Sequence, residues 1–513
     1  MDTILSMYKN RNNTTFDIDD FVSPFVDSIL SDINVVINLK DNSTLKSSIQ
    51  KSCTRELMSL AIKMLVTEAQ IYKIEHNLHA IHMKDFIKTL LNNNELLHTQ
   101  LKLYPFLFSS LYKQSIYITK SYKELFYRFE NDKEELIDNK LIDKNDEILS
   151  IDREAGDGHQ NNKKVMEINC TNTSIYYKPK NSNLTLLLFN IQKWIETNSN
   201  LQFYRYKILN KENYAYEEKV ENVKVIYQRD IDHYYYNFGV TLGLIYLLNG
   251  SDYHFENIIA HKEYPVMIDN ETLFNPTVSD INIHSHLLYS GMLPNPSTPF
   301  DFSALYGSFG NQTMQVEQIV KKNGEYFIEK QDFHLSKKKN KPIDTIDYTY
   351  IYEKERQNII AGFTEIITII IKNKNDFINY LKNIISTHYN FNNAKIRVVI
   401  RPSMFYAEIL QKLLHPYNVK TNKTAADFIN NSLYTLNLSE EFITSEREQL
   451  LNGDIPIFHL KMFENHLIES PSYTTEVTPY EGLIQKISNL SSLNIMLGKK
   501  AILSILNTKY QTF

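Results

Sequence analysis

Cysteine and glycine are scarce in this sequence. Its 513 residues include two cysteines, Cys53 and Cys170, which excludes a disulfide scaffold and any cysteine-rich zinc or iron–sulfur site. Only 13 residues are glycine, and neither G-x-G-x-x-G nor G-x-x-x-x-G-K-[ST] occurs. Nucleotide chemistry in this chain would therefore need a phosphate-binding device other than a glycine-rich loop.

A large charge of either sign is also missing. Lys and Arg total 55 and Asp and Glu total 60, so the net charge is −5 and no basic field points to nucleic acid. The first residues lack the apolar segment of a signal peptide. The strongest apolar runs, 240–248 and 366–371, are far shorter than the roughly 20 residues that span a bilayer. We therefore expect a cytoplasmic protein without a membrane span.

The length predicts about three domain-sized units, and the residue pattern changes twice along the chain. Residues 1–150 carry apolar side chains at helical spacing, residues 151–233 are β-rich, and residues 234–513 return to helical patterns. This order predicts an α+β protein that is mostly helical. We expect a bilobal fold like that of protein and lipid kinases, with a β-rich N-lobe, a helical C-lobe and an N-terminal helical extension.

The same patterns predict individual elements. Helices are expected at 51–78, 83–91, 101–127, 184–195 and 234–248. Strands are expected at 165–170, 174–177, 203–209, 223–228, 257–268 and 396–400. We interpret residues 133–152 as an exposed hairpin or linker and residues 293–312 as a loop rich in Pro, Ser, Asn and Gly.

Four polar residues occur in the order that phosphoryl transfer requires. Asp252 precedes Asn257 by five residues, within one residue of the spacing in the kinase catalytic loop H-R-D-L-x-x-x-N. Asp269 ends a short apolar strand, where a kinase places its second metal-binding Asp, and Lys178 ends another predicted strand. In such a site one carboxylate orients the attacking hydroxyl, and the other oxygen ligands hold Mg²⁺ against the phosphates of ATP.

Each of these residues also has an ordinary structural explanation. Asp and Asn commonly cap turns, and a lysine at the end of a strand is commonly solvated, so each explanation is favoured when a residue is taken singly. Taken together and in kinase order, the four residues favour a kinase. No glycine-rich loop, H-R-D or D-F-G accompanies them.

The surrounding motifs resemble those of one enzyme family. LLNGSDYHFENIIA at 247–260 and YPVMIDNETLF at 264–274 are similar to the dehydratase domain of class II lanthipeptide synthetases, which act in lantibiotic biosynthesis. Four further motifs follow the order of that family: GDGH at 156–159, YKPK at 177–180, RVVIRPS at 397–403 with Tyr406 behind it, and NGDIPIF at 452–458. The resemblance covers about residues 150–510.

The resemblance implies a lipid-kinase-like fold and an enzyme that uses ATP and Mg²⁺. Members of the family phosphorylate Ser and Thr of a ribosomal precursor peptide and then eliminate the phosphate, leaving dehydroalanine or dehydrobutyrine. The resemblance implies that Lys178 contacts ATP phosphate, that Asp252, His254 and Asn257 form the catalytic loop, and that Asn257, Asp269 and Glu271 bind the metal ion. It assigns elimination to Arg397 and Ser403, with Arg401 as a phosphate partner. Asp157 and His159 are implied as further catalytic residues.

The chemistry of elimination supports a phosphate-binding role for Arg397 and Arg401. A base must remove the α-proton, and a cation must stabilise the departing phosphate, for which the guanidinium fork is better suited than an ammonium group. Alternate arginines on a strand also occur on solvated faces. We expect Arg397 and Arg401 to share one face of a strand beside Pro402, and we favour the phosphate role. For His254, the alternative is a histidine that satisfies backbone groups at a helix end.

Two departures from the family pattern leave three functions open. Asn161, Asn162 and Lys163 stand where the family has Gly-Gly-Arg, which removes the freedom of glycine and the bidentate contact of arginine. Ser403 replaces Thr but keeps a hydroxyl. The chain is then a dehydratase, a Ser/Thr peptide kinase that stops at the phosphopeptide, or a catalytically weak scaffold that binds the peptide.

The cysteine positions bear on the partners of this protein. A full synthetase of the family carries a zinc cyclase, and neither cysteine lies where such a domain would place its ligands. We therefore expect a stand-alone dehydratase-like unit without a cyclase domain. Its expected partners are a precursor peptide, leader plus core, and a separate cyclase.

Overall fold

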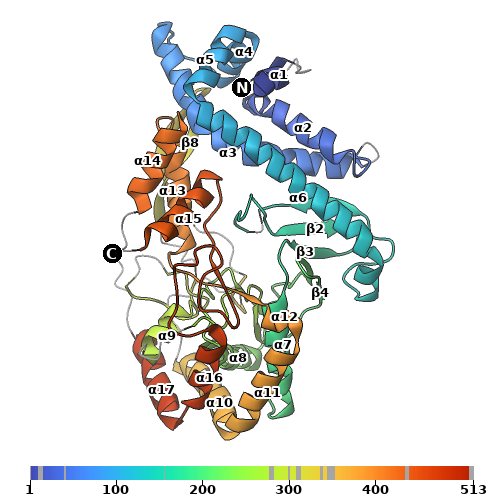
Figure 1. Ribbon diagram of the computed structural model, residues 1–513, viewed down its shortest axis with the longest axis vertical. Helices are drawn as coiled ribbons and strands as arrows, with labels where there is room; N and C mark the ends of the chain where they lie inside the picture. The colour runs from blue at the N-terminus through green and yellow to red at the C-terminus, as the bar shows by residue number, and fades with distance from the viewer. Residues whose placement is uncertain are drawn as a thin grey trace.

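The computed structural model describes residues 2–9, 16–39, 42–154, 156–276, 282–297, 301–307, 313–334, 339–343, 353–433 and 438–507. Helices make up most of the regular structure, and the strands in these ranges form one five-stranded sheet and three two-stranded sheets (Figure 1). The predicted α+β, mostly helical class is confirmed. No helix in the described ranges has the length and apolar character needed to cross a bilayer.

Helices form the N-terminal region, as predicted. They are α1 (Asp2–Lys9), η1 (Ile18–Phe21), α2 (Ser23–Ile33), α3 (Ser43–Glu75), α4 (Met83–Asn92), α5 (Asn94–Leu103) and α6 (Pro105–Asp138). The single helix predicted at 101–127 is wrong, because Pro105 begins a new helix after a break at Tyr104. Helix α6 also continues through residues 133–138, which were predicted to be a linker.

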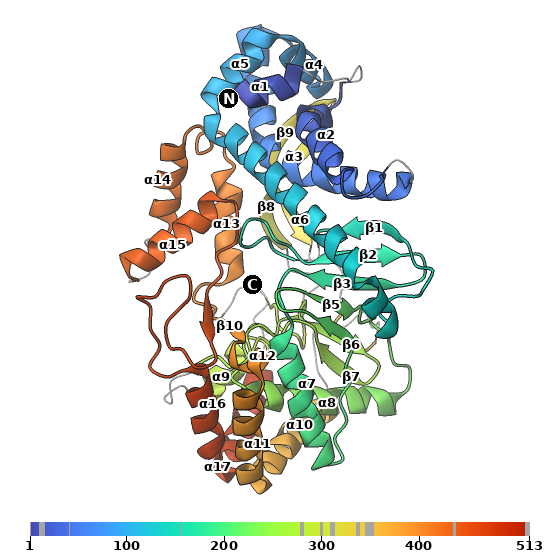
Figure 2. The ribbon, with the colours of Figure 1, turned by 45° about the vertical axis from the view of Figure 1, so that its right-hand side comes forward.

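A five-stranded antiparallel sheet follows, in the order β1-β2-β3-β5-β4. Its strands are β1 (Ile148–Asp152), β2 (Met166–Cys170), β3 (Ser174–Lys178), β4 (Ile208–Asn210) and β5 (Ala215–Glu218). Helix α6 runs across this sheet (Figure 2). The strands predicted at 165–170 and 174–177 are confirmed, and the one at 203–209 shrinks to β4. The strand predicted at 223–228 is wrong: within the described residues this segment forms only one isolated bridge, between Val223 and His261.

A helical body lies on the other side of the sheet. Its elements are α7 (Asn183–Thr197), α8 (Gln228–Leu247), β6 (Ile258–His261), β7 (Tyr264–Met267), α9 (Ile283–Tyr289), α10 (Glu353–Lys372), α11 (Lys374–Thr387), α12 (Tyr389–Asn392), α16 (Pro479–Ser488) and α17 (Ser492–Asn507). Helices α8 and α10 cross so closely that a Cβ on Gly239 or Gly362 would collide with the other helix's backbone. The hairpin β6–β7 confirms the β patch predicted at 257–268.

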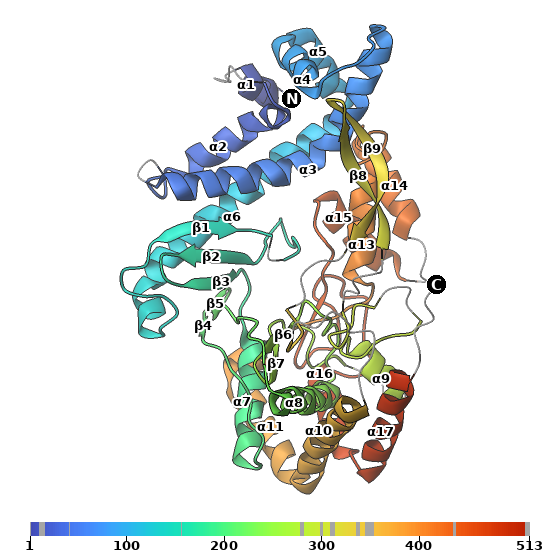
Figure 3. The ribbon, with the colours of Figure 1, turned by 180° about the vertical axis from the view of Figure 1, so that it is seen from behind.

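A third group of elements lies between the N-terminal helices and the helical body (Figure 2). It comprises β8 (Thr313–Lys322), β9 (Glu325–His334), β10 (Lys395–Arg397), β11 (His459–Lys461), α13 (Ser403–Leu413), α14 (Asn422–Leu433) and α15 (Glu440–Leu451). The β8–β9 hairpin extends along α13 and α14 to the N-terminal helices (Figure 3). Its turn, Asn323-Gly324, has φ of 52° and 87°, as a two-residue hairpin turn needs. The loop predicted at 293–312 lies partly outside the described residues.

The buried cores combine segments that lie far apart in the sequence. One core combines the N-terminal helices, the five-stranded sheet and helices α13–α15. A second core contains α7, α8, α10, α11, α16 and α17. Helix α7 lies within the β-rich region of the sequence, yet it packs on the helical body, where Trp194 contacts Phe377 with ring centroids 4.7 Å apart.

Candidate active site

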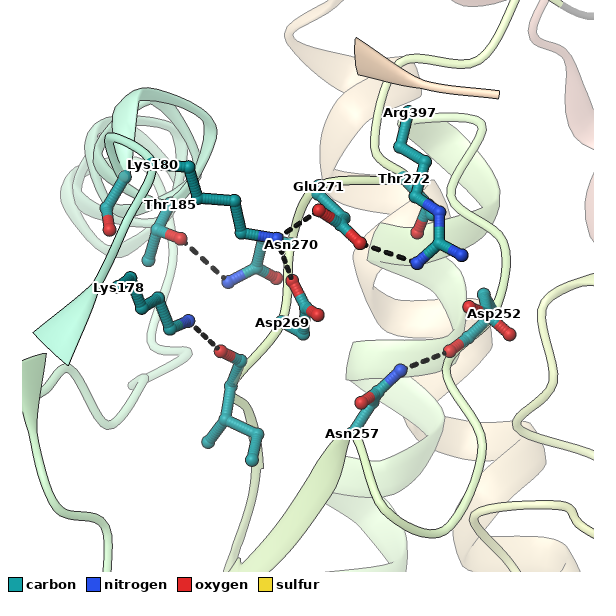
Figure 4. Close-up of polar contacts among 12 residues, drawn as sticks. Lys178, Lys180, Thr185, Asp252, Asn257, Asp269, Asn270, Glu271, Thr272 and Arg397 are labelled. Carbon is teal, nitrogen blue, oxygen red and sulfur yellow. Dashed lines mark hydrogen bonds and ion pairs between the residues drawn. The ribbon is translucent and has the colours of Figure 1, made fainter. Parts of the chain in front are cut away.

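Four segments meet between the sheet and the helical body (Figure 4). They are the end of β3, the loop between α8 and β6, the turn after β7, and the chain from β10 into α13. Each segment contributes charged or amide side chains to the same place. Residues that the sequence spreads from 178 to 397 are therefore neighbours in the fold.

The α8–β6 loop presents Asp252. This residue has φ of +64°, in the left-handed region that Asp tolerates better than most residues. Asn257 Nδ2 donates to the Asp252 carbonyl at 2.7 Å, and His254 Nε2 lies 3.8 Å from an Asp252 carboxylate oxygen. Burial raises the pKa of Asp252, although the charges of His254 and Arg397 oppose the rise. A carboxyl with a raised pKa is suited to accept a proton.

The turn after β7 carries Asp269 and Glu271. Lys180 lies between them, with its Nζ in an ion pair with Glu271 and 3.7 Å from Asp269 Oδ1. The residue between the two acids, Asn270, is buried and receives a hydrogen bond from Tyr253 at 3.1 Å. It donates in turn to Thr185 on α7 at 3.2 Å. These bonds fix the turn that holds both carboxylates.

Lys178 is held by a partner that the sequence did not reveal. Its Nζ forms an ion pair of 2.8 Å with Glu217 on β5 and donates to the Ile268 carbonyl at 2.8 Å. Protein kinases pair the ATP-binding lysine of their third strand with a glutamate from a helix. In this chain the glutamate comes from the neighbouring strand, where it is 3% exposed and also accepts a bond of 2.6 Å from Ser182.

Arg397 connects the predicted metal-binding and elimination residues. Its Nη1 donates to Glu271 Oε1 and its Nη2 donates to Ser403 Oγ, both at 2.7 Å. Burial lowers the pKa of Arg397, but the charges of Glu271 and Asp252 outweigh it and raise that pKa. Burial raises the pKa of Glu271, but Lys180 and Arg397 hold it well below the usual value. Arg397 and Glu271 are therefore both charged.

Arg401 does not share a face with Arg397, so that prediction is wrong. Strand β10 ends at Arg397, and the chain turns before α13 begins at Ser403. Arg401 donates through Nε and Nη2 to Glu446 at 2.7 and 3.2 Å, and both side chains are almost fully buried. Because Tyr406 also donates to Glu446, the structure gives Arg401 a stabilising role between α13 and α15.

His159 lies on the β1–β2 loop, close enough to Arg397 and Glu271 for their charges to affect it. Burial and the Arg397 charge lower the pKa of His159, although Glu271 opposes them. Its Nδ1 lies 2.7 Å from the Ile455 carbonyl. A carbonyl only accepts, so Nδ1 carries the proton and Nε2 is the basic nitrogen of a neutral ring. Asp157 is exposed on the same loop.

The GDGH and NGDIPIF motifs are in direct contact. Asp454 accepts from the backbone N–H groups of Asn161 and Asn162, both at 2.8 Å, and Ile455 N donates to the Gly158 carbonyl at 2.9 Å. Asn161 and Asn162 have φ of 71° and 56°. Asn is among the few non-glycine residues that tolerate this region, so these two residues suit the backbone of the turn.

Asn257 and Asp269 are the pair best suited to Mg²⁺. The hydrogen bonds of Asn257 use Nδ2 and leave its amide oxygen for a ligand, and the Asp269 side chain is 34% exposed. Mg²⁺ commonly takes one or two protein oxygens and completes its shell with water and phosphate. No cluster of three His, Cys, Asp or Glu ligands occurs among the residues described. Glu271 fits less well, because both its oxygens contact cations.

The chain belongs to the family described as a domain of unknown function, DUF4135, whose model matches residues 104–461. The match includes every segment of the site. The chain is also similar to the lacticin 481/lactococcin biosynthesis protein LcnDR2 of Lactococcus lactis subsp. lactis, with 25% identity over 416 residues. That similarity covers 72% of this chain and 42% of the relative's length. That relative is named for the biosynthesis of lacticin 481 and lactococcin.

Proposed function

We propose that this protein transfers phosphate from ATP, with Mg²⁺, to Ser and Thr of a ribosomally made precursor peptide and then eliminates it. One observation carries the proposal: the Arg397 guanidinium joins Ser403 to Glu271 beside Asp252 and Asp269. Groups suited to phosphoryl transfer and to phosphate release are thus adjacent. Similarity to a lantibiotic biosynthesis protein supports the peptide substrate.

In the first step, Asp252 would accept the proton of the Ser or Thr hydroxyl of the peptide. The oxygen of that hydroxyl would take the terminal phosphoryl group of ATP, and ADP would leave. Asn257 and Asp269 would hold Mg²⁺, which would neutralise charge at the phosphates. Lys178 would contact ATP phosphate, and Glu217 holds its ammonium group in place. The kinase-like bilobal arrangement belongs to this proposal, supported by the antiparallel sheet above the helical body.

In the second step, the Cα–H bond and the Cβ–O bond of the phosphorylated residue break, and a double bond forms between these carbons. Nε2 of the neutral His159 would take the proton, and phosphate would leave with the C–O electron pair. Arg397 would stabilise the departing phosphate, because its fork matches phosphate oxygens. Ser403 orients that fork through its hydroxyl.

A kinase that stops at the phosphopeptide is the second candidate. It is favoured by the engagement of Arg397, whose Nη1 and Nη2 already contact Glu271 and Ser403. A phosphate would have to replace one of these contacts to gain bidentate binding. The third possibility, a peptide-binding scaffold without catalysis, has less support because Lys178, Asp252, Asn257 and Asp269 are all brought together.

Mass spectrometry of one peptide separates these functions. The protein is incubated with a precursor peptide, ATP and Mg²⁺, and the intact mass is measured. Peptide lighter by one water per modified residue supports the dehydratase, and peptide heavier by stable phosphate supports the kinase. Unchanged peptide, together with no ATP turnover above that of Asp252→Asn, supports the scaffold and contradicts the proposal.

A further inference from the structure

Glu56, on helix α3 of the N-terminal region, contacts both ends of the β1–β2 loop. Its Oε1 accepts from Asn162 Nδ2 at 2.6 Å and lies 2.9 Å from Lys164 Nζ. Its Oε2 lies 3.3 Å from Arg153 Nε. Arg153 precedes the GDGH motif and Lys164 follows the loop, so one carboxylate from outside the sheet joins the two sides of the loop.

The loop has a shape that needs support from outside. Gln160, Asn161 and Asn162 have φ of 47°, 71° and 56°, so three successive non-glycine residues are left-handed. Such backbone costs free energy at each residue and persists where surrounding contacts impose it. Asp454 supplies two of those contacts through the Asn161 and Asn162 N–H groups. Glu56 supplies another through the Asn162 side chain.

Two groups on α6 hold the Asp454 side of this assembly. Gln114 Nε2 donates to the Asn452 carbonyl at 2.6 Å, and Lys113 Nζ donates to Asn452 Oδ1 at 3.1 Å. Helices α3 and α6 therefore fix both partners of the contact between the 156–163 loop and the 452–458 loop.

The position of His159 depends on this loop. His159 and Lys163 exchange two backbone hydrogen bonds, His159 N to Lys163 O at 3.1 Å and Lys163 N to His159 O at 2.8 Å. The left-handed residues lie between them. A change of backbone at Asn162 is thus transmitted directly to His159, whose ring lies within the electrostatic reach of Arg397 and Glu271.

We propose that Glu56 is a positioning residue, which holds the 156–163 loop so that His159 stays within electrostatic reach of the Arg397–Glu271 ion pair. The assignment of His159 to proton removal rests on the proposed function, whereas the fixation of the loop does not. The inference gives the N-terminal helices a role in the reaction. They complete the active site from the side opposite the helical body.

Glu56 is suited to this role because it stays ionised. Burial raises its pKa, but the charges of Arg153 and Lys164 and the Asn162 hydrogen bond outweigh burial and lower the pKa to about 2. Arg153 is 1% exposed and stacks over the Tyr122 ring of α6, 5.3 Å from its centroid. The carboxylate therefore remains charged throughout the pH range in which the enzyme would act.

The test compares Glu56→Gln with the neighbouring Arg55→Gln in the full chain. Arg55 lies on the same helix and pairs with Glu154, but both side chains are 56% exposed, so this control removes a surface contact only. Because Glu56→Gln leaves buried Arg153 without its charged partner, it risks unfolding. Asn162→Gly is the second variant: glycine accepts φ of 56°, and the change removes the hydrogen bond to Glu56 together with the restraint that a side chain places on the backbone.

The first measurement is hydrogen–deuterium exchange of peptides covering 156–163, which needs no activity. We expect Glu56→Gln and Asn162→Gly to accelerate exchange in this loop, while Arg55→Gln leaves it unchanged. Equal protection in all the folded variants would overturn the proposal. If Glu56→Gln fails to fold, Asn162→Gly alone decides this measurement.

The second measurement follows phosphorylated and dehydrated peptide over time. We expect elimination to slow roughly tenfold to a hundredfold in both variants, as small displacements of a reacting group can do, with phosphorylation changed less than about threefold. Equal slowing of both steps would indicate a merely structural role and would overturn the assignment. If the wild-type protein yields neither product, the proposed function is contradicted. Hydrogen–deuterium exchange of residues 156–163 still tests whether Glu56 fixes the loop.

Discussion

Arg397 and Glu271 are joined by both backbone and side chain. The Arg397 backbone N–H donates to the Glu271 carbonyl at 2.7 Å, and Nη1 donates to Oε1, also at 2.7 Å. The two residues are 126 positions apart in sequence. This double connection fixes the turn that bears Asp269 to the strand that bears Arg397, so the proposed phosphorylation and elimination groups form one rigid unit.

Arg397→Lys is expected to separate the two proposed steps. Lysine has a single charged nitrogen and cannot reach Glu271 and Ser403 with the geometry of a guanidinium fork. Phosphopeptide should accumulate, with elimination slowed at least about a hundredfold. Liquid chromatography with mass spectrometry measures both products. Ser403→Thr is the control because it keeps the hydroxyl. If Arg397→Lys lost phosphorylation while Ser403→Thr kept it, the assignment of Arg397 to elimination would be contradicted.

Asp252→Asn and Asp269→Asn are expected to abolish phosphorylation. The first removes the proposed proton acceptor and the second a carboxylate ligand of Mg²⁺, so each should lower kcat by about a hundredfold or more. Release of ADP in the presence of peptide measures the step. Glu256→Gln is a matched control in the same loop, since its side chain is 68% exposed. Retained turnover in either Asp variant would count against the site.

Glu217→Gln is expected to weaken the use of ATP more than the chemical step. The amide keeps the bond from Ser182 but loses the charge that fixes Lys178, so KM for ATP should rise roughly tenfold. Steady-state kinetics with varied ATP measures this. Glu218→Gln changes the next residue, whose side chain is 35% exposed, and should behave as wild type. An unchanged KM for ATP would show that Lys178 does not need its partner.

Lys486 is expected to make stability depend on pH. Burial lowers its pKa to about 7, beneath the roughly 10.4 of an unfolded chain. Between these values the unfolded chain holds the extra proton, so stability rises with pH from about 7 towards 10. Lys486 Nζ donates to Asn249 Oδ1 at 2.5 Å and lies over the Tyr246 ring.

Urea denaturation of wild type and Lys486→Met at several pH values tests this expectation. Lys486→Met lacks the group whose titration makes stability rise with pH. As pH increases above about 7, the free energy of unfolding of wild type should therefore increase relative to that of the variant. Lys412→Met, at a side chain 63% exposed, should give a constant difference. A constant difference for Lys486→Met as well would contradict the burial of its charge.

Much of the site was predictable because it follows local rules. Asp252, Asn257 and Asp269 lie on a loop and turn that flank one short hairpin, so their sequence spacing largely determines their spatial relation. The long amphipathic helices α3 and α4 followed from apolar spacing. The β8–β9 hairpin was missed, although Asn323-Gly324 between alternating apolar residues is a strong local signal.

Other features depend on contacts that one sequence does not reveal. Glu56 and Asn162 are 106 positions apart, and Asn161 and Asp454 are 293 apart. No local pattern marks Glu56 among the other charged residues of α3. Glu217 was equally hidden, because its role depends on β3 and β5 being neighbours. The prediction that Arg397 and Arg401 share a face was wrong for a similar reason. The strand ends at Arg397, and Arg401 pairs with buried Glu446, which is distant in sequence.

A time course with a single precursor peptide tests most directly whether one site performs both steps. The peptide is mixed with wild-type protein, ATP and Mg²⁺, and its intact mass is followed from the first turnover. Phosphopeptide should appear first and then decline as peptide lighter by one water accumulates, and Arg397→Lys should stop the series at the phosphopeptide. Dehydrated peptide that forms without ATP, or phosphopeptide that never declines in wild type, would contradict the account.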